Sequence, residues 1–127
     1  MSNDEKPHVY VPPGETPPAE LEIEDLTVGE GAEATSGSTE SVHYVGVAHS
    51  SGEEFDASYN RGAPLEFRLG TGQVIQGWDQ GVEGMKVGGR RQLVIPPHLG
   101  YGDRGAGGGV IKPGETLIFV VDLLEVR

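Results

Sequence analysis

The sequence predicts an α+β fold in which an antiparallel β-sheet curves over a single short helix. From Leu21 onward, apolar residues mostly alternate with other residues, which is the pattern of β-strands. One stretch around residue 80 instead repeats its apolar residues every three or four positions, as a helix does. The chain also holds 21 glycines and 9 prolines among its 127 residues, about twice the usual share. Such a composition indicates many turns and argues against a helical bundle.

The first predicted strand contains an irregularity. Leu21 and Ile23 alternate, but the parity then slips to Leu26 and Val28. An extra residue in one strand produces such a slip, so we expect a bulge or bend at this point.

Five further segments have the character of strands. They are 42–48, 54–56, 65–69 and 93–95, which alternate, and 117–124, which does not. Ser51-Gly52 turns the chain between the first two segments, and Pro96-Pro97 ends the fourth. Because residues 117–124 are apolar on both parities, this strand should be central and covered on both faces.

The single helix is predicted to be short. Ile75, Trp78, Val82 and Met85 form an apolar stripe of about two turns. Gly81 lies inside the stripe and costs roughly 1 kcal/mol relative to alanine, so packing against the sheet must hold this helix together.

Residues 1–19 differ from the rest of the chain. They contain five prolines and few core-forming residues, so we expect an extended, Pro-rich acidic arm ahead of a folded domain over residues 20–127. The interpretation we favour is a tail without a role, and we expect the domain to fold without it. In the alternative interpretation, Val9, Tyr10 and Val11 pin the arm across the sheet.

The net charge of −11 lies mostly at the front of the chain. Residues 1–36 hold nine acidic residues and one lysine (−8), whereas residues 37–127 hold eleven acidic and eight basic residues (−3). Phosphate binding needs clustered lysine and arginine, and only Arg90 and Arg91 are adjacent, so we expect no nucleic-acid partner. The absence of cysteine excludes disulfides and thiolate chemistry. Since no segment has the pattern of a signal peptide or a membrane span, we expect a cytoplasmic protein without membrane contacts.

The sequence contains no catalytic or metal-binding motif whose surrounding residues fit such a site. Residues 100–105 read GxGxxG, but more glycines follow where a dinucleotide site needs a helix. The four histidines are scattered, and His43 and His49 lie about 20 Å apart along an extended strand. We therefore expect no metal, no cofactor and no hydrolase chemistry.

A series of short stretches carries a more specific signal. They are Val42-His43-Tyr44-Val45-Gly46, Glu54-Phe55-Asp56-Ala57-Ser58, Val74-Ile75-Gln76-Gly77-Trp78-Asp79, Met85-Lys86-Val87-Gly88-Gly89, Ile95-Pro96, Tyr101-Gly102 and Thr116-Leu117-Ile118-Phe119. In this order and spacing, they resemble the FKBP-type peptidyl-prolyl cis-trans isomerases over residues 20–127. The resemblance implies a curved antiparallel sheet of five to six strands wrapped around one short α-helix, which agrees with the pattern above.

The resemblance also implies an active site in the form of an apolar bowl. Trp78 would form the floor, Tyr44, Phe55, Val74, Ile75 and Phe119 the walls, and Tyr101 and Asp56 the polar rim. The residues implied as catalytic are Asp56, Tyr44, Tyr101, Trp78 and Phe119. Those implied to bind substrate or ligand are Phe55, Arg61, Leu65, Gln73, Val74, Ile75, Val110 and Ile111. Arg61 and the Tyr44 hydroxyl would hold Asp56 near the rotating carbonyl. Taken without the resemblance, Trp78 and Phe119 have the character of core residues.

Two features depart from the family pattern. Residue 65 is leucine where the family commonly has phenylalanine, which makes one wall smaller. The glycine-rich loop over residues 103–109 is about one residue longer than usual and lacks a bulky histidine near Ala106 or Gly107. Both bear on substrate preference and on affinity for macrolides.

The implied function is a peptidyl-prolyl cis-trans isomerase that acts in protein folding on proline-containing polypeptides. FK-type and rapamycin-type macrolides would be its inhibitors. An alternative is a non-catalytic module that uses the same bowl to bind proline peptides or macrolides. A third hypothesis, chaperone-like holding of chains, needs an exposed apolar flap that the sequence does not supply. One small acidic domain predicts a monomer.

Overall fold

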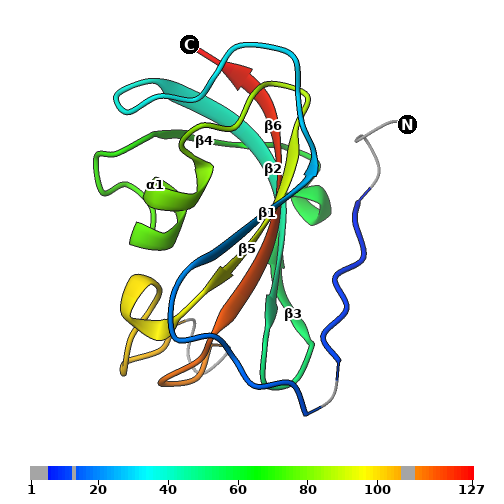
Figure 1. Ribbon diagram of the computed structural model, residues 1–127, viewed down its shortest axis with the longest axis vertical. Helices are drawn as coiled ribbons and strands as arrows, with labels where there is room; N and C mark the ends of the chain where they lie inside the picture. Colours follow the sequence, from blue (N-terminus) through cyan, green and yellow to red (C-terminus); the bar gives the residue numbers. More distant parts are fainter. Residues whose placement is uncertain (1–5, 13, 107–110) are drawn as a thin grey trace.

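The computed structural model describes residues 6–12, 14–106 and 111–127, and it shows one antiparallel sheet curved around a short helix (Figure 1). The strands are β1 (Glu22–Thr27), β2 (Thr39–Ala48), β3 (Glu54–Ala57), β4 (Leu65–Arg68), β5 (Arg90–Ile95) and β6 (Leu117–Val126). The α-helix is α1 (Gln76–Val82), and the 3-10 helices are η1 (Ser58–Arg61) and η2 (Pro97–Leu99). This architecture confirms the predicted α+β fold. In the described part of the chain, no helix is long and apolar enough to cross a membrane.

The strand β6 occupies the middle of the sheet. The strand order is β1-β5-β6-β2-β3, and β4 pairs with the remaining length of β2 beside β3. Along β6, Phe119 and Val121 join a cluster on the inner face, which α1 covers, while Ile118 and Val120 join a cluster on the outer face. The prediction of a central strand covered on both faces is therefore confirmed.

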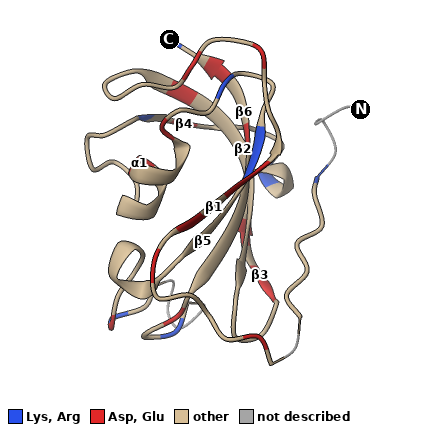
Figure 2. Ribbon diagram, viewed as in Figure 1, with Lys and Arg blue, Asp and Glu red and all other residues tan. Residues whose placement is uncertain are grey.

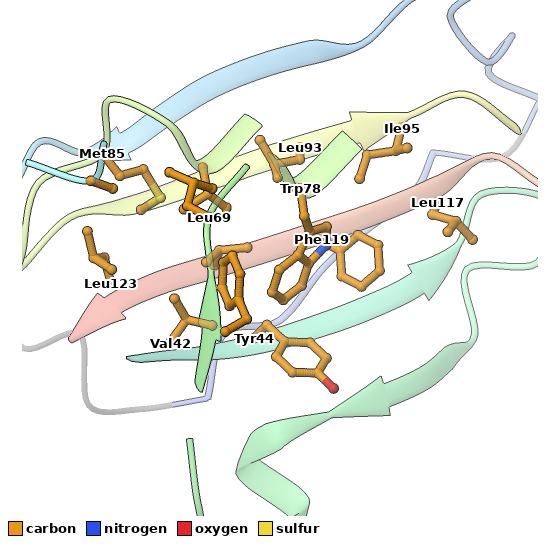
Figure 3. Packing of buried hydrophobic residues seen from close by; sticks show 14 of the residues in the cluster. Val42, Tyr44, Leu69, Trp78, Met85, Leu93, Ile95, Leu117, Phe119 and Leu123 are labelled. Atoms are coloured by element: carbon orange, nitrogen blue, oxygen red, sulfur yellow. The ribbon is translucent and has the colours of Figure 1, made fainter. Parts of the chain in front are cut away.

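The helix α1 lies unusually close to β5. A Cβ atom added to Gly77 would come within 2.5 Å of the Ile95 side chain, and one added to Gly81 within 2.7 Å of the Leu93 side chain. The two glycines thus allow the helix backbone to rest directly on the sheet. This contact compensates for the low helix propensity of Gly81. It also turns Trp78 into the inner cluster, where it lies among the core side chains (Figure 3).

The edge strand β1 has the predicted irregularity, but its apolar side chains are largely exposed. Its register against β5 shifts between Asp25 and Thr27, which confirms the bulge. Ile23 and Leu26 are each 47% exposed, however, because β1 lies at the sheet edge. Here the apolar alternation does not produce a buried face. Three acidic residues, Glu22, Glu24 and Asp25, lie along this strand (Figure 2).

The N-terminal arm contacts the outer face of the sheet, on the side opposite α1 (Figure 1). Val9 is only 8% exposed and packs in the outer cluster, whereas the neighbouring Tyr10 is 70% exposed. Val11 packs against the same cluster. Lys6 Nζ lies 2.9 Å from Glu54 Oε1 on β3. These contacts favour the interpretation in which the arm is pinned across the sheet, with Val9 and Val11 as the packed residues.

We expect Val9→Ala to lower the melting temperature while the matched change Tyr10→Ala leaves it nearly unchanged. Losing two buried methyl groups costs about 1–1.5 kcal/mol, which corresponds to about 4–6 °C for a chain of this size. Thermal melts of the two variants and of a chain starting at Ala19 measure this. Equal melting temperatures for all of them would show that the arm does not stabilise the fold.

The burial of the Glu40 carboxyl was not foreseen from the sequence. Glu40 lies at the start of β2, between Phe67 of β4 and Val126 of β6, and is fully buried. Ser38 donates a hydrogen bond of 2.8 Å to its Oε2, and Oε1 has no hydrogen-bond partner among the described residues. Burial raises the pKa of Glu40, more than the Ser38 hydrogen bond lowers it. Protonation of this acid is therefore more favourable in the folded state than in the unfolded chain.

We expect Glu40→Gln to stabilise the fold at neutral pH by about 1 kcal/mol, or about 4 °C in melting temperature. Because folding raises the pKa of Glu40, the free energy of unfolding contributed by this group is fully present below the unfolded pKa and is lost as pH rises through the folded pKa. The advantage of the amide should therefore vanish near pH 4 and appear at pH 7. Melts at both pH values measure it, with the exposed Glu125→Gln as control. A gain of the same size at pH 4 would contradict the assignment of a buried titrating carboxyl.

Candidate functional site

A small pocket opens on the inner face of the sheet, beside α1. Its volume is about 100 Å³, and it is lined by Tyr44, Phe55, Asp56, Leu65, Val74, Ile75, Trp78, Tyr101 and Phe119. All of these residues belong to the set implied by the resemblance. Aromatic and aliphatic side chains make up the lining apart from Asp56, which carries the single formal charge in it.

The floor of the pocket is a cluster of aromatic rings held by four different elements. Trp78 from α1 is buried and meets Tyr44 of β2 and Phe119 of β6 edge to face, with ring centroids 5.0 Å and 5.2 Å apart (Figure 3). Phe55 of β3 meets Phe119 in the same way at 5.5 Å. Edge-to-face contacts place the positive edge of one ring against the negative face of the next, which fixes the orientation of both. The floor is therefore preformed and rigid.

Gly46 allows two of these rings to lie over the backbone of β2. A Cβ atom at this position would come within 2.7 Å of both Phe55 and Phe119. Sequence reasoning counted Gly46 in a strand pattern and in a family stretch but gave it no role. A glycine inside an otherwise regular strand often marks such a close approach, and this signal was available.

The polar rim is a closed network of three side chains. Arg61 Nη1 donates to Asp56 Oδ1 at 2.7 Å, and Arg61 Nη2 donates to the Tyr44 hydroxyl at 2.9 Å. The Tyr44 hydroxyl in turn donates to Asp56 Oδ2 at 2.5 Å. The structure thus brings Tyr44, Asp56 and Arg61 into the contact that the resemblance implied. Asp56 and Arg61 lie at the mouth, with side chains 42% and 50% exposed.

The electrostatics of the rim keep its hydroxyl groups protonated. Burial, followed by the hydrogen bond to Asp56, raises the pKa of Tyr44. Burial and the charge of Asp56 also raise the pKa of Tyr101. The hydrogen bonds that Arg61 donates to the Tyr44 hydroxyl and to Asp56 raise the pKa of Arg61 further above its usual value. At neutral pH the rim therefore holds two neutral hydroxyl groups, of which that of Tyr44 already donates to Asp56, and one ion pair around an apolar floor.

Three described residues of the implied ligand-binding set, Arg61, Gln73 and Ile111, are not among the residues that line this pocket. Arg61 instead lies beside it, paired with Asp56. Gln73 is exposed, and its Oε1 accepts a hydrogen bond of 2.8 Å from the backbone N–H of Arg68. Ile111 is buried in the inner cluster and forms an isolated bridge with Ala106. Val110 lies outside the described residues.

A larger hollow of about 460 Å³ lies between the arm and the turn that joins β2 to β3. Its lining includes Val11, Pro12, His49 and Glu115 but no phenylalanine, tyrosine or tryptophan. Both carboxylate oxygens of Glu115 accept hydrogen bonds from Ser50, so this acid is already satisfied. Among the residues described, no group of three or more histidine, aspartate or glutamate side chains could hold a metal ion. The smaller aromatic pocket is therefore the stronger candidate.

The pocket can hold a small apolar ring against Trp78 and remove water from it. Hydrogen-bond donors and the ion pair meet the ligand only at the mouth, where a polar backbone could remain attached. This arrangement favours a ligand that combines a compact apolar group with amide carbonyls.

Comparison with known proteins gives a consistent result. The family model for FKBP-type peptidyl-prolyl cis-trans isomerase matches residues 30–124. The chain is 70% identical over 122 residues to an FK506-binding protein of Streptomyces anulatus, covering 96% of this chain and 98% of the relative. It is 50% identical over 121 residues to a probable FK506-binding protein of Corynebacterium glutamicum, covering 95% and 98%. The crystal structure of AtFKBP13 is similar with a TM-score of 0.78 and 46% identity, covering 87% of this chain and 96% of that one.

Proposed function

Because the chain belongs to the FKBP-type peptidyl-prolyl cis-trans isomerase family, we propose that it accelerates rotation about X-Pro bonds in proline-containing polypeptides. The observation that carries the proposal is the aromatic pocket floored by Trp78, with the hydrogen-bonded rim of Tyr44, Asp56 and Arg61 at its mouth. The isomerase would reside in residues 20–127, with residues 1–19 as the arm. Its cytoplasmic location and monomeric state stay predictions from the sequence.

The size of the barrier determines what the pocket must supply. Rotation about an X-Pro bond faces ~18–20 kcal/mol because amide resonance is lost, and spontaneous exchange takes tens to hundreds of seconds. Raising the rate to about a thousand turnovers per second requires roughly 7 kcal/mol of preferential stabilisation of the twisted amide. Neither a covalent intermediate nor proton transfer is needed for this step.

The residues of the pocket meet this requirement by desolvation and positioning. The planar amide is more polar than the twisted amide, so a site without water disfavours the planar ground state more. In our proposal the proline ring lies on Trp78, between Phe55, Phe119 and the Tyr44 ring. The backbone N–H of Ile75 and the Tyr101 hydroxyl would donate hydrogen bonds to flanking carbonyls. Asp56, oriented by Arg61 and Tyr44, would lie beside the carbonyl that rotates.

We also propose that FK-type and rapamycin-type macrolides occupy this pocket. Support comes from the names of the relatives in Streptomyces anulatus and Corynebacterium glutamicum, which are FK506-binding. Leu65 lines the pocket and makes one wall aliphatic. We therefore expect weaker contacts with a bound ring on this side than a phenylalanine would give.

A protease-coupled assay on a proline tetrapeptide, with and without a macrolide, tests the function. We expect catalytic acceleration of the slow cis-to-trans phase that the macrolide abolishes. A parallel titration follows the emission of Trp78, the one tryptophan in the chain, and should saturate at one macrolide per protein. Saturable binding without acceleration would instead identify a non-catalytic binding module. Acceleration that the macrolide inhibits without changing the emission would remove Trp78 from the site.

We expect Asp56→Ala to lower kcat/KM about tenfold, which is ~1.4 kcal/mol of transition-state interaction, with little effect on stability. The Asp56–Arg61 pair is half exposed, and pairs of this kind contribute at most about 1 kcal/mol to folding. Asp25 offers a matched control, because its side chain is equally exposed (42%) and pairs with Arg91 at 2.7 Å, outside the pocket. Asp25→Ala should leave kcat/KM unchanged. If Asp56→Ala lowers the melting temperature without changing turnover of the folded fraction, Asp56 is structural.

A further inference from the structure

The chain between β3 and β4 passes from one face of the sheet to the other and back. Asp56, at the end of β3, lines the pocket, and Arg61, at the end of η1, pairs with it. Between them, η1 carries Tyr59 to the outer face, where this side chain packs against the outer cluster. The geometry of the Asp56–Arg61 pair therefore depends on how firmly η1 is held.

Tyr59 packs against a row of three side chains, one on each of three adjacent strands. His43 of β2 and Arg90 of β5 both stand opposite Asp122 of β6 in the strand register. The Tyr59 ring stacks on the His43 ring with centroids 4.5 Å apart and an interplanar angle of 19°. Its hydroxyl donates a hydrogen bond to Asp122 Oδ2. Tyr59 thus ties η1 to the central strand of the sheet.

The acceptor of this hydrogen bond is itself immobile. Asp122 is fully buried, and Arg90 binds both of its oxygens, with Nε 2.6 Å from Oδ1 and Nη2 3.1 Å from Oδ2. A bidentate pair of this kind has little freedom to reorient. Burial, followed by the hydrogen bond to Asp122, raises the pKa of Tyr59, so the phenol is protonated and acts as a donor at neutral pH.

Ser58 fixes the preceding residue of η1. Its Oγ accepts a hydrogen bond of 2.7 Å from the backbone N–H of Tyr44 and lies 2.8 Å from His43 Nδ1. Two consecutive residues of η1 are therefore attached to β2 and β6. Asn60 adds a third attachment, because it donates to Glu54 Oε2 at 2.9 Å and accepts a hydrogen bond of 3.0 Å from Lys6 of the arm.

We propose that Tyr59 is a positioning residue for the isomerase reaction, holding η1 from the outer face so that Arg61 keeps Asp56 and the Tyr44 hydroxyl oriented in the pocket. This inference rests on the proposed function. It assigns a role in the reaction to a side chain on the face of the sheet opposite the substrate.

The variant Tyr59→Phe isolates the hydrogen bond, because it retains the ring that stacks on His43. We expect kcat/KM to fall about three- to tenfold, mainly through kcat, since the rim loses its orientation while the aromatic floor that binds the ring is unchanged. Tyr10→Phe is the matched control on an exposed tyrosine. Ile118→Val removes one methyl group from the outer cluster but leaves the hydrogen bonds of η1 in place, and it controls for stability alone. Both controls should keep the kcat/KM of the unmodified chain.

A double-mutant comparison tests whether Tyr59 acts through the rim. In the Asp56→Ala background, Tyr59→Phe should change kcat/KM by less than about twofold, because the group that it positions is already absent. The same loss in both backgrounds, or a loss of equal size in Ile118→Val, would overturn the proposal and leave Tyr59 with a role in stability only.

A spectroscopic measurement separates this inference from the proposed function. In the unmodified chain, the two hydrogen bonds of Arg61 should give distinct, slowly exchanging guanidinium N–H signals in ¹⁵N NMR spectra. Tyr59→Phe should merge or broaden these signals, and Tyr10→Phe should not. If the unmodified chain shows no isomerase activity, the proposed function fails, and the NMR result still decides whether Tyr59 positions Arg61. Unchanged Arg61 signals in Tyr59→Phe would overturn the inference even in an active enzyme.

Discussion

The direct contact between α1 and β5 determines where the pocket can form. Gly77 and Gly81 have no side chains to separate the helix from Ile95 and Leu93, so α1 rests on the sheet at backbone distance. At that distance the indole of Trp78 reaches the rings of β2 and β6, and it becomes a floor instead of filling a gap between two layers. A larger residue at either glycine would raise the helix and open the floor to water. The apolar character of the site thus depends on two residues that do not themselves line the pocket.

The inner face of the sheet forms the pocket and the outer face packs against the arm. The same strands contribute side chains to both faces. The inner face of β2 and β6 presents Tyr44 and Phe119 to the pocket. The outer face of the same strands presents Val45, Val47, Ile118 and Val120, which the arm covers through Val9. Because alternate residues of one strand serve both faces, a change on the outer face reaches the pocket only where it shifts the strand itself. A large loss of outer packing would therefore disturb the floor, whereas the loss of one methyl group from the outer cluster would not.

Local pattern in the sequence was sufficient for most of the fold, because alternation reports directly on burial. It identified the central strand over residues 117–124, the short helix around Trp78 and the bulge after Ile23. It did not reveal that Ile23 would be exposed, since alternation carries no information on whether an edge strand is covered. The burial of Glu40 was hidden for a similar reason: its neighbours Phe67 and Val126 are distant in sequence. For the site, the resemblance named every residue that lines the pocket. It also named Gln73 and Ile111, whose places depend on loop conformations that no short pattern encodes.

The ion pair at the rim depends on neighbouring groups for its orientation. Asp56 and Arg61 are half exposed, and a pair in that environment is too weak to hold two flexible side chains in one geometry. Its orientation must come from groups that are themselves immobile. The Tyr44 hydroxyl provides one of these from inside the pocket, and the attachment of η1 to buried Asp122 provides the other from outside. A site that works by desolvation, as we propose for this pocket, gains from leaving its charged carboxylate at the mouth, because burying that group in the floor would draw water into it. At the mouth, however, the Asp56–Arg61 pair is too weak to fix its own geometry. The hydrogen bonds that hold η1 on the outer face of the sheet supply the missing orientation.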